Sequence, residues 1–447
     1  DLLESRGLGD VYKRQPYVYK SNDGGKSWKN ITTGIPDGFL CWRLVQDHVD
    51  KNLMFLGTEY GVYVSVNGGL KWVKFSSGLP TISVRDLAIQ KRENDLVAAT
   101  FGRGFYVLDD YSSLRFLSAS SLKNNLVFTP RKALQYNPIR SGSTSQGSNT
   151  YYAKNPDYGA ILTFYLSDEI LTKKQMRLKV EKGLEKSNSN IPFPGWKELD
   201  DELNEKTPIT IIEIYNNENS FIDRFTLPYK KGFNRVSWDL TKKIKTHITS
   251  GSSRFYSPSI RVQPGKYSFN VYTVYGGQVN KIGSKFFEVE RIRPGILDNP
   301  NNDKIEEYVV EVESIFNEYS VVNSKFNKIK ETNKSIISLI SRSSNYQSYV
   351  ESYNNIQNKI NDIDVFVSGN KSKKDVREKD IETISDRLSV AVRGFNSSYG
   401  PTKMQIESLG KAMSLINQYA DMVEMLSKDF NKLKNQLESS TDLLILD

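Results

Sequence analysis

The chain has 447 residues, 25% of them charged and 11% aromatic, and its formal net charge is +9. This length accommodates two or three domains of ordinary size. The basic residues are spread along the chain and occur in short pairs, such as Lys230-Lys231 and Lys373-Lys374, with no clustered run. Because neutralising phosphates requires a clustered basic surface, this pattern argues against a nucleic-acid partner and is typical of a solubilising charge excess.

Low counts of metal-ligating side chains restrict the chemistry further. The single cysteine, Cys41, excludes an internal disulfide and a cysteine-rich zinc site. The only two histidines, His48 and His247, leave little scope for histidine-based metal or triad chemistry. We therefore expect no metal and no other cofactor. No apolar stretch approaches the ~18 residues that a membrane-spanning helix needs, so no membrane span is expected.

Residues 1–15, DLLESRGLGDVYKRQ, do not fit the sequence that follows and contain no initiator methionine. The string resembles the translated sequencing-adapter read-through found in environmental assemblies. We expect it to be an artefact and exclude it from the fold, as an expression tag is excluded. The protein's own sequence then begins at about Pro16, in the middle of a gene. A signal peptide is expected to have been lost with the missing N-terminal part.

An internal repeat follows. The segment SNDGGKSW at residues 21–28 recurs as SVNGGLKW at residues 65–72, 44 residues later, and GIP at 34–36 recurs as GLP at 78–80 with the same spacing. A period in the forties with four short strand-like runs per unit is typical of β-propeller blades. We expect residues 16–110 to form the last two to three blades. The predicted strands cover 42–46, 53–58, 61–65 and 71–75, then 84–89, 96–100 and 104–108.

The eight-residue segment has a structural logic. Asp23 stands in a tight turn, where a short carboxylate accepts backbone N–H bonds, and the glycines there permit positive φ. Trp28 begins the next strand and is expected to pack between neighbouring blades. Asn67 replaces the aspartate in the second copy, which keeps the turn and removes the charge. We therefore assign a structural role, without calcium binding or catalysis, to Ser21, Asp23, Gly25, Trp28, Ser65, Asn67, Gly69 and Trp72.

The motif S-x-D-x-G-x-x-W is the Asp box of sialidase-like propellers. The wider sequence resembles a bacterial family of sortilin-like, BNR-repeat proteins that are often labelled "glycosyl hydrolase". The matching stretches are PYVYKSNDGGKSW, FLGTEYGVYVSVNGGLKW, GLPTISVRDLAIQKRENDLVAATFGRGFYVLDD, GFNRVSWDL and PGKYSF. The resemblance implies a ring of roughly four to eight blades whose other members lie upstream. It also implies a secreted, periplasmic or cell-surface protein.

Beyond the repeat, the expected fold is multidomain, mainly β and then α. Residues 111–158 are expected to form an exit segment and linker. Residues 159–293 are expected to form an immunoglobulin-like β-sandwich with a polar insertion near 180–207, and Trp238 is expected in its core. Residues 294–447 are expected to form an antiparallel helical bundle. The predicted strands are 160–166, 209–215, 221–227, 234–240, 266–275 and 285–290, and the predicted helices run from 305 onward and over 346–366, 375–395 and 402–437.

Blade geometry predicts where a ligand would bind. Successive loops alternate between the two faces of a propeller, so the Asp boxes occupy one face. The loops 34–41, 58–61, 78–83 and 100–104 occupy the opposite face, which usually holds ligands. Asp37 is also on these loops, and Phe101 takes the place of Glu59 in the following blade. The ligand-face candidates are Arg43, Glu59, Tyr60, Arg85 and Arg103.

Two main functions are compatible with these residues. The first is a non-catalytic C-terminal part of a secreted or cell-surface propeller protein that binds a peptide, protein or glycan. The second is a sialidase-like or other Asp-box glycoside hydrolase, which needs two positioned carboxylates. Glu59 is a weak catalytic candidate in this chain, so the second reading places most of the catalytic carboxylates in missing upstream blades. A third hypothesis is a cell-surface protein whose C-terminal bundle mediates assembly.

Overall fold

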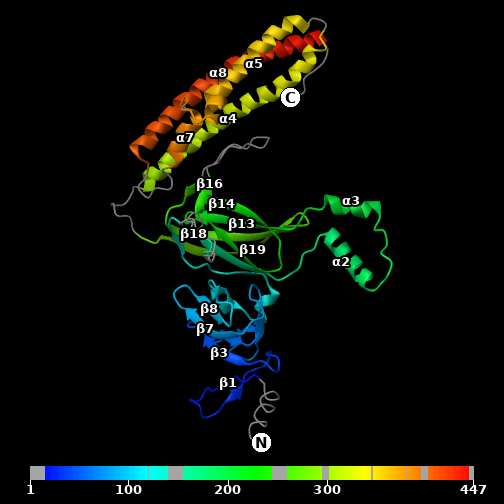
Figure 1. Cartoon of the computed structure of the whole chain (residues 1–447), viewed down its shortest axis with the longest axis vertical. Coiled ribbons are helices and arrows are strands. Elements are labelled where there is room, and N and C mark those ends of the chain that lie inside the picture. The colour runs from blue at the N-terminus through cyan, green and yellow to red at the C-terminus, as the bar shows by residue number, and fades with distance from the viewer. Residues whose placement is uncertain are drawn as a thin grey trace. The chain divides into compact units, whose positions relative to one another are not determined.

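A computed structural model describes residues 16–118, 120–138, 155–243, 259–293, 302–343, 346–378, 380–393 and 401–441. The chain is mainly β and then α, with several antiparallel sheets followed by long helices (Figure 1). It divides into two compact units, Asp1–Asp239 with Gly265–Glu290, and Leu240–Pro264 with Arg291–Asp447. The predicted artefact at residues 1–15 lies outside the described residues.

The first unit begins with three antiparallel sheets whose strands follow one another in chain order. A two-stranded sheet comes first, then a four-stranded sheet and a three-stranded sheet (Figure 1). The strands of the last two sheets begin and end within two residues of the predicted positions. The strands of the three sheets are, in turn, β1 (Tyr19–Lys20) and β2 (Lys29–Asn30); β3 (Cys41–Gln46), β4 (Met54–Thr58), β5 (Gly61–Ser65) and β6 (Val73–Phe75); and β7 (Val84–Gln90), β8 (Asp95–Thr100) and β9 (Phe105–Leu108).

Strand β4 is buried on both faces, because a different neighbour covers each. Phe55 packs with Val84 and Leu87 of β7 in one apolar cluster. Leu56, whose side chain points to the other face, packs with Ile31 beyond β2 in a second cluster. The three sheets are therefore stacked face to face in chain order.

Both Asp-box segments form the same hydrogen-bonded turn. In the first, Asp23 Oδ1 accepts the N–H of Ser27 at 2.9 Å, and Ser21 Oγ accepts the N–H of Gly25 at 2.8 Å. The hydrogen bonds from the Ser27 side chain and backbone hold the pKa of Asp23 well below its usual range. In the second, Asn67 Oδ1 accepts the N–H of Lys71 at 3.0 Å without needing a charge.

The two box tryptophans differ in their surroundings. Trp72 is 1% exposed, and its Nε1 donates a hydrogen bond of 2.6 Å to the carbonyl of Ile31 in the preceding repeat. The backbone approaches so closely that a Cβ on Gly34 would lie 2.3 Å from the Trp72 carbonyl oxygen. The prediction that Trp28 packs between neighbouring blades is wrong. It is 63% exposed and donates to Gly25 in its own turn, because the described residues place no strand over it.

A buried carboxylate joins the last two stacked sheets to the segment that leaves them. Asp47, just after β3, accepts the hydroxyl of Tyr111 at 2.6 Å and the guanidinium of Arg115 at 2.8 and 2.9 Å. Arg115 lies in the short 3-10 helix η1 (Ser112–Phe116) and also donates to Asn94 at 2.6 Å. This bidentate pair fixes the direction in which the chain departs after β9.

The charge state of this cluster follows from its contacts. Burial alone would raise the pKa of the Asp47 carboxyl, but hydrogen bonds from Arg115 and Tyr111 outweigh that effect and hold the pKa well below its usual range. Burial and then the hydrogen bond to Asp47 raise the pKa of Tyr111, so its hydroxyl remains a donor at neutral pH.

The remaining strands of the first unit form two further sheets. Trp238 is 2% exposed, as predicted for a core residue, and its ring packs against Tyr267 and Phe287 of the other sheet at 5.6 and 6.0 Å. Arg235 donates to the carbonyls of Asp109 and Asp110 after β9, at 2.7 and 2.6 Å. The sheets are β10 (Leu126–Val127), β12 (Ala160–Leu166) and β15 (Gly232–Trp238); and β11 (Ala133–Gln135), β19 (Gln278–Arg291), β18 (Gly265–Tyr275), β13 (Ile209–Asn216) and β14 (Phe221–Pro228).

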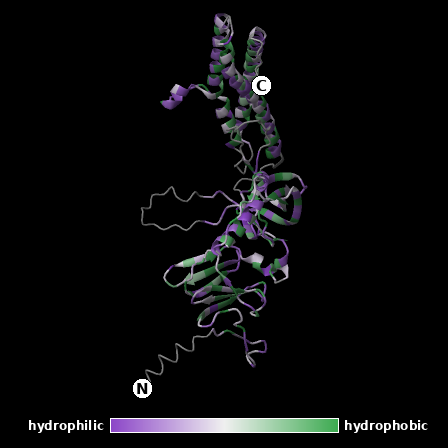
Figure 2. Ribbon diagram, turned by 90° about the vertical axis from the view of Figure 1, so that its right-hand side faces the viewer, coloured by the Kyte–Doolittle hydropathy of each residue, from purple (hydrophilic) through white to green (hydrophobic). Residues whose placement is uncertain are grey.

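The second unit contains the long helices and a small hairpin. Figure 2 shows hydrophobic and hydrophilic residues alternating along each long helix, as expected of amphipathic helices. None of the described helices is both long enough and apolar enough to cross a bilayer. The elements are β16 (Thr241–Lys243), β17 (Ser259–Arg261), α4 (Asn302–Ile340), α5 (Tyr346–Ser368), α6 (Lys371–Asp375), α7 (Ile384–Arg393) and α8 (Lys403–Thr441).

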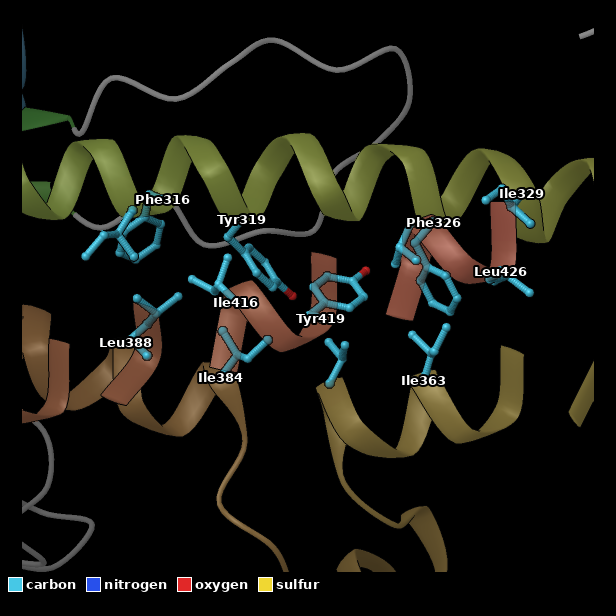
Figure 3. Close-up of a cluster of buried hydrophobic side chains, with 14 of the residues drawn as sticks. Phe316, Tyr319, Phe326, Ile329, Ile363, Ile384, Leu388, Ile416, Tyr419 and Leu426 are labelled. Carbon is cyan, nitrogen blue, oxygen red and sulfur yellow. The ribbon is translucent and has the colours of Figure 1, made fainter. Parts of the chain in front are cut away.

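The long helices α4 and α8 run parallel to each other. Tyr308 near the start of α4 donates to the carbonyl of Gln405 near the start of α8, and further along Tyr319 contacts Tyr419 at 6.0 Å between ring centroids. Helices α5 and α7 share the remaining position, and their apolar side chains point into the same core (Figure 3). The bundle is therefore up–down–up, with its middle column divided in two.

The predicted helix over residues 375–395 is too long at its start. The described helix α7 begins only at Ile384, because Thr383 and Asp386 cap it reciprocally: the Asp386 N–H donates to Thr383 Oγ1 at 3.2 Å, and the Thr383 N–H donates to Asp386 Oδ2 at 3.0 Å. Arg377, upstream, has a φ of 59°, which a helix does not accept.

The contrast between the two box tryptophans gives a first prediction. Trp72→Ala should lower the free energy of unfolding by about 3–5 kcal/mol, because it removes a buried indole and leaves a cavity. Trp28→Ala should change it by about 0.5 kcal/mol or less, because that side chain is exposed. Urea denaturation followed by circular dichroism measures both. Equal effects of the two substitutions would contradict the packing described for Trp72.

The buried pair gives a second prediction. Arg115→Gln should lower the free energy of unfolding by about 3–5 kcal/mol at neutral pH, because it leaves the Asp47 carboxylate buried without its cation. In a chain that carries Asp47→Asn, the same substitution should cost much less. Denaturation of the four chains of this double-mutant cycle measures the coupling.

The same cluster predicts a pH dependence. Because the folded-state pKa of Asp47 is depressed, its stabilisation is fully present above the pKa of about 4 of an unfolded aspartate, and it is lost as the pH falls toward the folded-state pKa. The difference in stability between the wild type and Arg115→Gln should therefore shrink below about pH 4. A difference that stays constant down to pH 2 would exclude this role of Asp47.

Candidate functional site

The first strands of two stacked sheets, β3 and β7, carry a β-bulge at the same position. The register of β3 on β4 shifts between Cys41 and Arg43, and the register of β7 on β8 shifts between Val84 and Asp86. The extra residues are Trp42 in one strand and Arg85 in the other. A bulge redirects the side chain of its extra residue, and bulges are frequent next to functional sites.

The two bulged residues stack on each other. Arg85 Cζ lies 3.8 Å from the centroid of the Trp42 ring and 5.3 Å from that of Phe101, which belongs to the turn between β8 and β9. Trp42 is 40% exposed and Phe101 is 69% exposed. A guanidinium that contacts aromatic rings through its face keeps its N–H donors at its edge, where a ligand can reach them. We call Trp42, Arg85 and Phe101, with Arg43 and Asp86, the Trp42–Arg85 surface.

An ion pair borders the stacked residues. Arg43 Nε lies 3.2 Å from Asp86 Oδ1, and the two side chains are 58% and 64% exposed. These residues follow the bulged positions in their strands, so the packing of the sheet of β3 against the sheet of β7 brings them together. An exposed pair of this kind contributes little to stability. The pair engages the Asp86 carboxylate with Arg43. Arg85, the other guanidinium of the surface, contacts the rings of Trp42 and Phe101.

The other sequence candidates lie in the neighbouring turns. Tyr60 is 39% exposed and packs on Phe39, with ring centroids 4.6 Å apart. Glu59 donates its N–H to Leu40 at 3.0 Å. Its Oε2 atom is buried, and no described residue donates a hydrogen bond to it. Arg103 is exposed in the turn between β8 and β9.

The arrangement is suited to binding. Glycosidic cleavage needs two carboxyl groups about 5–9.5 Å apart on either side of the scissile bond. On the Trp42–Arg85 surface, Asp86 is engaged by Arg43, and in the neighbouring turn no described residue donates a hydrogen bond to the buried oxygen of Glu59. The described residues also contain no group of three or more His, Cys, Asp or Glu side chains that could hold a metal ion. The groups that the site offers to a ligand are exposed aromatic rings and the guanidinium of Arg85.

The structure brings only part of the predicted set together. It brings Arg43 and Arg85 together on β3 and β7, whereas Tyr60, Glu59 and Arg103 lie in the neighbouring turns. Sequence reasoning missed Trp42 and Phe101 as site residues, because an aromatic residue at a strand end is typical of core packing. The available signal was the spacing: Trp42 and Arg85 are 43 residues apart, close to the repeat period, and each precedes a charged residue.

Comparison with known proteins adds little. No protein-family model and no curated protein matches the chain. It is similar to the extracellular domain of a hybrid two-component system from B. thetaiotaomicron, with 11% identity and a TM-score of 0.18 over 61% of this chain and 29% of that one. It is similar to the extracellular domain of a one-component system from the same organism, with 12% identity and a TM-score of 0.18 over 62% and 28%. The chain thus spans less than a third of either domain, and likenesses with so low a TM-score establish neither fold nor function.

Proposed function

We propose that the chain is the non-catalytic C-terminal part of a secreted or cell-surface Asp-box propeller protein, and that the Trp42–Arg85 surface binds a peptide, protein or glycan. The face-to-face stacking of β3–β6 and β7–β9 supports the propeller part of this proposal, because blades pack in this way around a ring. The two repeated box turns support it as well. The proposed location rests on the sequence resemblance alone.

The domain organisation that accompanies this function is also a proposal. Residues 16–110 are the last two to three blades, and residues 111–158 lead out of them. Residues 159–293 are an immunoglobulin-like sandwich, supported by the packing of Trp238 between its two sheets, and strands β10 and β11 of the preceding segment add one strand to each sheet. Residues 294–447 are the helical bundle.

The observation that carries the binding function is the stack of Arg85 on Trp42 at paired bulges. Trp, Tyr and Arg side chains are enriched at binding hot spots. A local distortion of two strands at the same place presents both side chains to solvent, although burying the indole would release more free energy. The edge of the guanidinium would donate to carbonyl, carboxylate or hydroxyl oxygens of a ligand, and the exposed rings would stack on its apolar faces.

Binding assays on the whole chain test this function. Peptide and glycan arrays identify bound probes, and fluorescence titration gives their affinity. Arg85→Ala and Trp42→Ala should each weaken binding by about 30-fold or more, the loss typical of a hot-spot residue. Arg92→Ala and Trp28→Ala are matched controls, because both side chains are exposed and lie outside the Trp42–Arg85 surface. These controls should bind like the wild type.

Three outcomes would overturn the proposal. The first is that no probe binds at high micromolar concentration. The second is that Arg85→Ala and Trp42→Ala bind as tightly as their controls, which would place the ligand elsewhere. The third is hydrolysis of a bound glycan that Glu59→Gln abolishes, because this would assign an enzyme to the face and make Glu59 a catalytic residue.

A further inference from the structure

The predicted polar insertion of the first unit forms a helical hairpin. It consists of α2 (Lys173–Lys186) and α3 (Trp196–Asn204), which lie between β12 and β13 in the chain and beside each other in space (Figure 1). A reciprocal capping box of Thr172 and Gln175 begins α2. Arg177 joins the two helices through a bidentate contact with Glu202 at 2.7 and 2.9 Å. The two helices of the hairpin are therefore joined by an ion pair of their own.

This hairpin displays an unusual amount of apolar surface. No residue of either helix is buried in the chain. Trp196 and Leu203 are 77% and 83% exposed, and with Leu199 they have the i, i+3, i+7 spacing of one helix face. Phe193, which is 63% exposed, extends this face through a ring contact of 5.1 Å with Trp196. The exposed apolar side chains of the hairpin are Met176, Leu178, Val180, Ile191, Phe193, Trp196 and Leu203.

The size of this surface corresponds to a protein interface. A fully buried aromatic side chain removes about 150–250 Å² from water. The seven side chains, two of them aromatic, together expose on the order of 800 Å², the area that each partner contributes to a standard interface. Leu178 points away from Met176 and Val180, because residues two apart lie on opposite sides of a helix, so one partner covers only part of this area. Isolated apolar residues on a surface need no explanation, but the continuous face of Phe193, Trp196 and Leu203 is typical of an interaction site.

The charges of the hairpin indicate what covers it. Helix α2 carries six basic and two acidic side chains, for a net charge of +4. Helix α3 carries four acidic side chains and one lysine, for a net charge of −3. Opposite charges are thus segregated onto two neighbouring helices that both expose apolar residues. A hairpin of this kind is complementary to a second copy of itself, because a two-fold axis sets α2 of one copy against α3 of the other.

We propose that the α2–α3 hairpin is the self-association surface of this protein. Two copies pair isologously, so that the Trp196–Leu203 face of α3 in one copy packs on the apolar side of α2 in the other. Lys182 and Lys186 of α2 then face Glu198 and Asp200 of α3, because Asp201 and Glu202 already pair with Lys173 and Arg177 of their own hairpin. A lipid surface suits the hairpin less well, because its largest exposed side chains lie on the acidic helix, which anionic headgroups repel.

The first test is the mass of the whole chain in solution. Sedimentation equilibrium between about 1 and 100 µM should show a dimer, since an interface of this size supports micromolar or tighter affinity. The double variant Trp196→Ser/Leu203→Ser should weaken dimerisation at least 100-fold. Met425→Ser is the matched control, because Met425 is 64% exposed on α8, away from the hairpin sequence, and it should dimerise like the wild type. Circular dichroism checks that each variant is folded.

A charge exchange tests the pairing itself. Lys182→Glu/Lys186→Glu makes α2 neutral, and Glu198→Lys/Asp200→Lys makes α3 weakly basic. Each variant alone should dimerise at least 10-fold more weakly than the wild type. A mixture of the two should form a heterodimer, because the wild-type α2 of one then meets the wild-type α3 of the other.

Several results would overturn the proposal. One is a wild-type chain that remains monomeric at 100 µM. If that monomer sediments with phosphatidylcholine–phosphatidylglycerol vesicles, the hairpin is assigned to a lipid surface instead. Another is a dimer that Trp196→Ser/Leu203→Ser leaves unchanged, which would place the contact elsewhere. A third is a mixture of the charge variants that associates no better than either variant alone.

Discussion

The burial of β4 on both faces is the interaction on which the N-terminal part depends. A sheet of four short strands has too little apolar area to be stable alone, and it becomes stable when each face meets another sheet. Phe55 and Leu56 are adjacent in the chain and both nearly inaccessible, so β4 needs β7 on one side and the preceding repeat on the other. Trp72 extends this dependence, since its indole is bound by the Ile31 carbonyl of the earlier repeat. Each sheet therefore requires its neighbour, which is how a repeated unit gains stability.

Stacking also explains why the two ends of the sheets differ in chemistry. At the Asp-box end, hydrogen bonds inside each turn satisfy the polar groups, and the roles of Asp23 and Asn67 are met locally. At the opposite end, the strands β3 and β7 are distorted by bulges, and their side chains meet across the boundary between sheets. The polar groups of the box turns are hydrogen-bonded within each turn and so are not available to a ligand. The exposed stack of Arg85 on Trp42, in contrast, leaves N–H donors and ring faces available. This asymmetry is the basis on which binding is proposed at one end only.

The helices of the chain treat their apolar side chains in two different ways. In the second unit, α4, α5, α7 and α8 bury their apolar faces against one another, with Tyr419 between Tyr319 and Phe326 (Figure 3). In the α2–α3 hairpin, ion pairs such as Arg177 with Glu202 connect the helices while Trp196 and Leu203 stay in solvent. The first arrangement is complete within one chain. The second leaves the apolar face of α3 in solvent, where we propose that a second copy of the chain covers it.

Sequence alone determined the elements whose signals are local. The 44-residue repeat, the box turns, the strands from β3 to β9 and the amphipathic helices follow from spacing, glycine positions and apolar periodicity, which act over a few residues. The tertiary structure decided features that arise between distant segments: the burial of Trp72 but not Trp28, the Asp47–Arg115 pair, and the meeting of Trp42 with Arg85 and Phe101. It also decided that α7 starts at Ile384 and that the polar insertion is a helical hairpin. Register shifts and contacts between sheets depend on which segments become neighbours, and neither the period nor the composition of the chain specifies that.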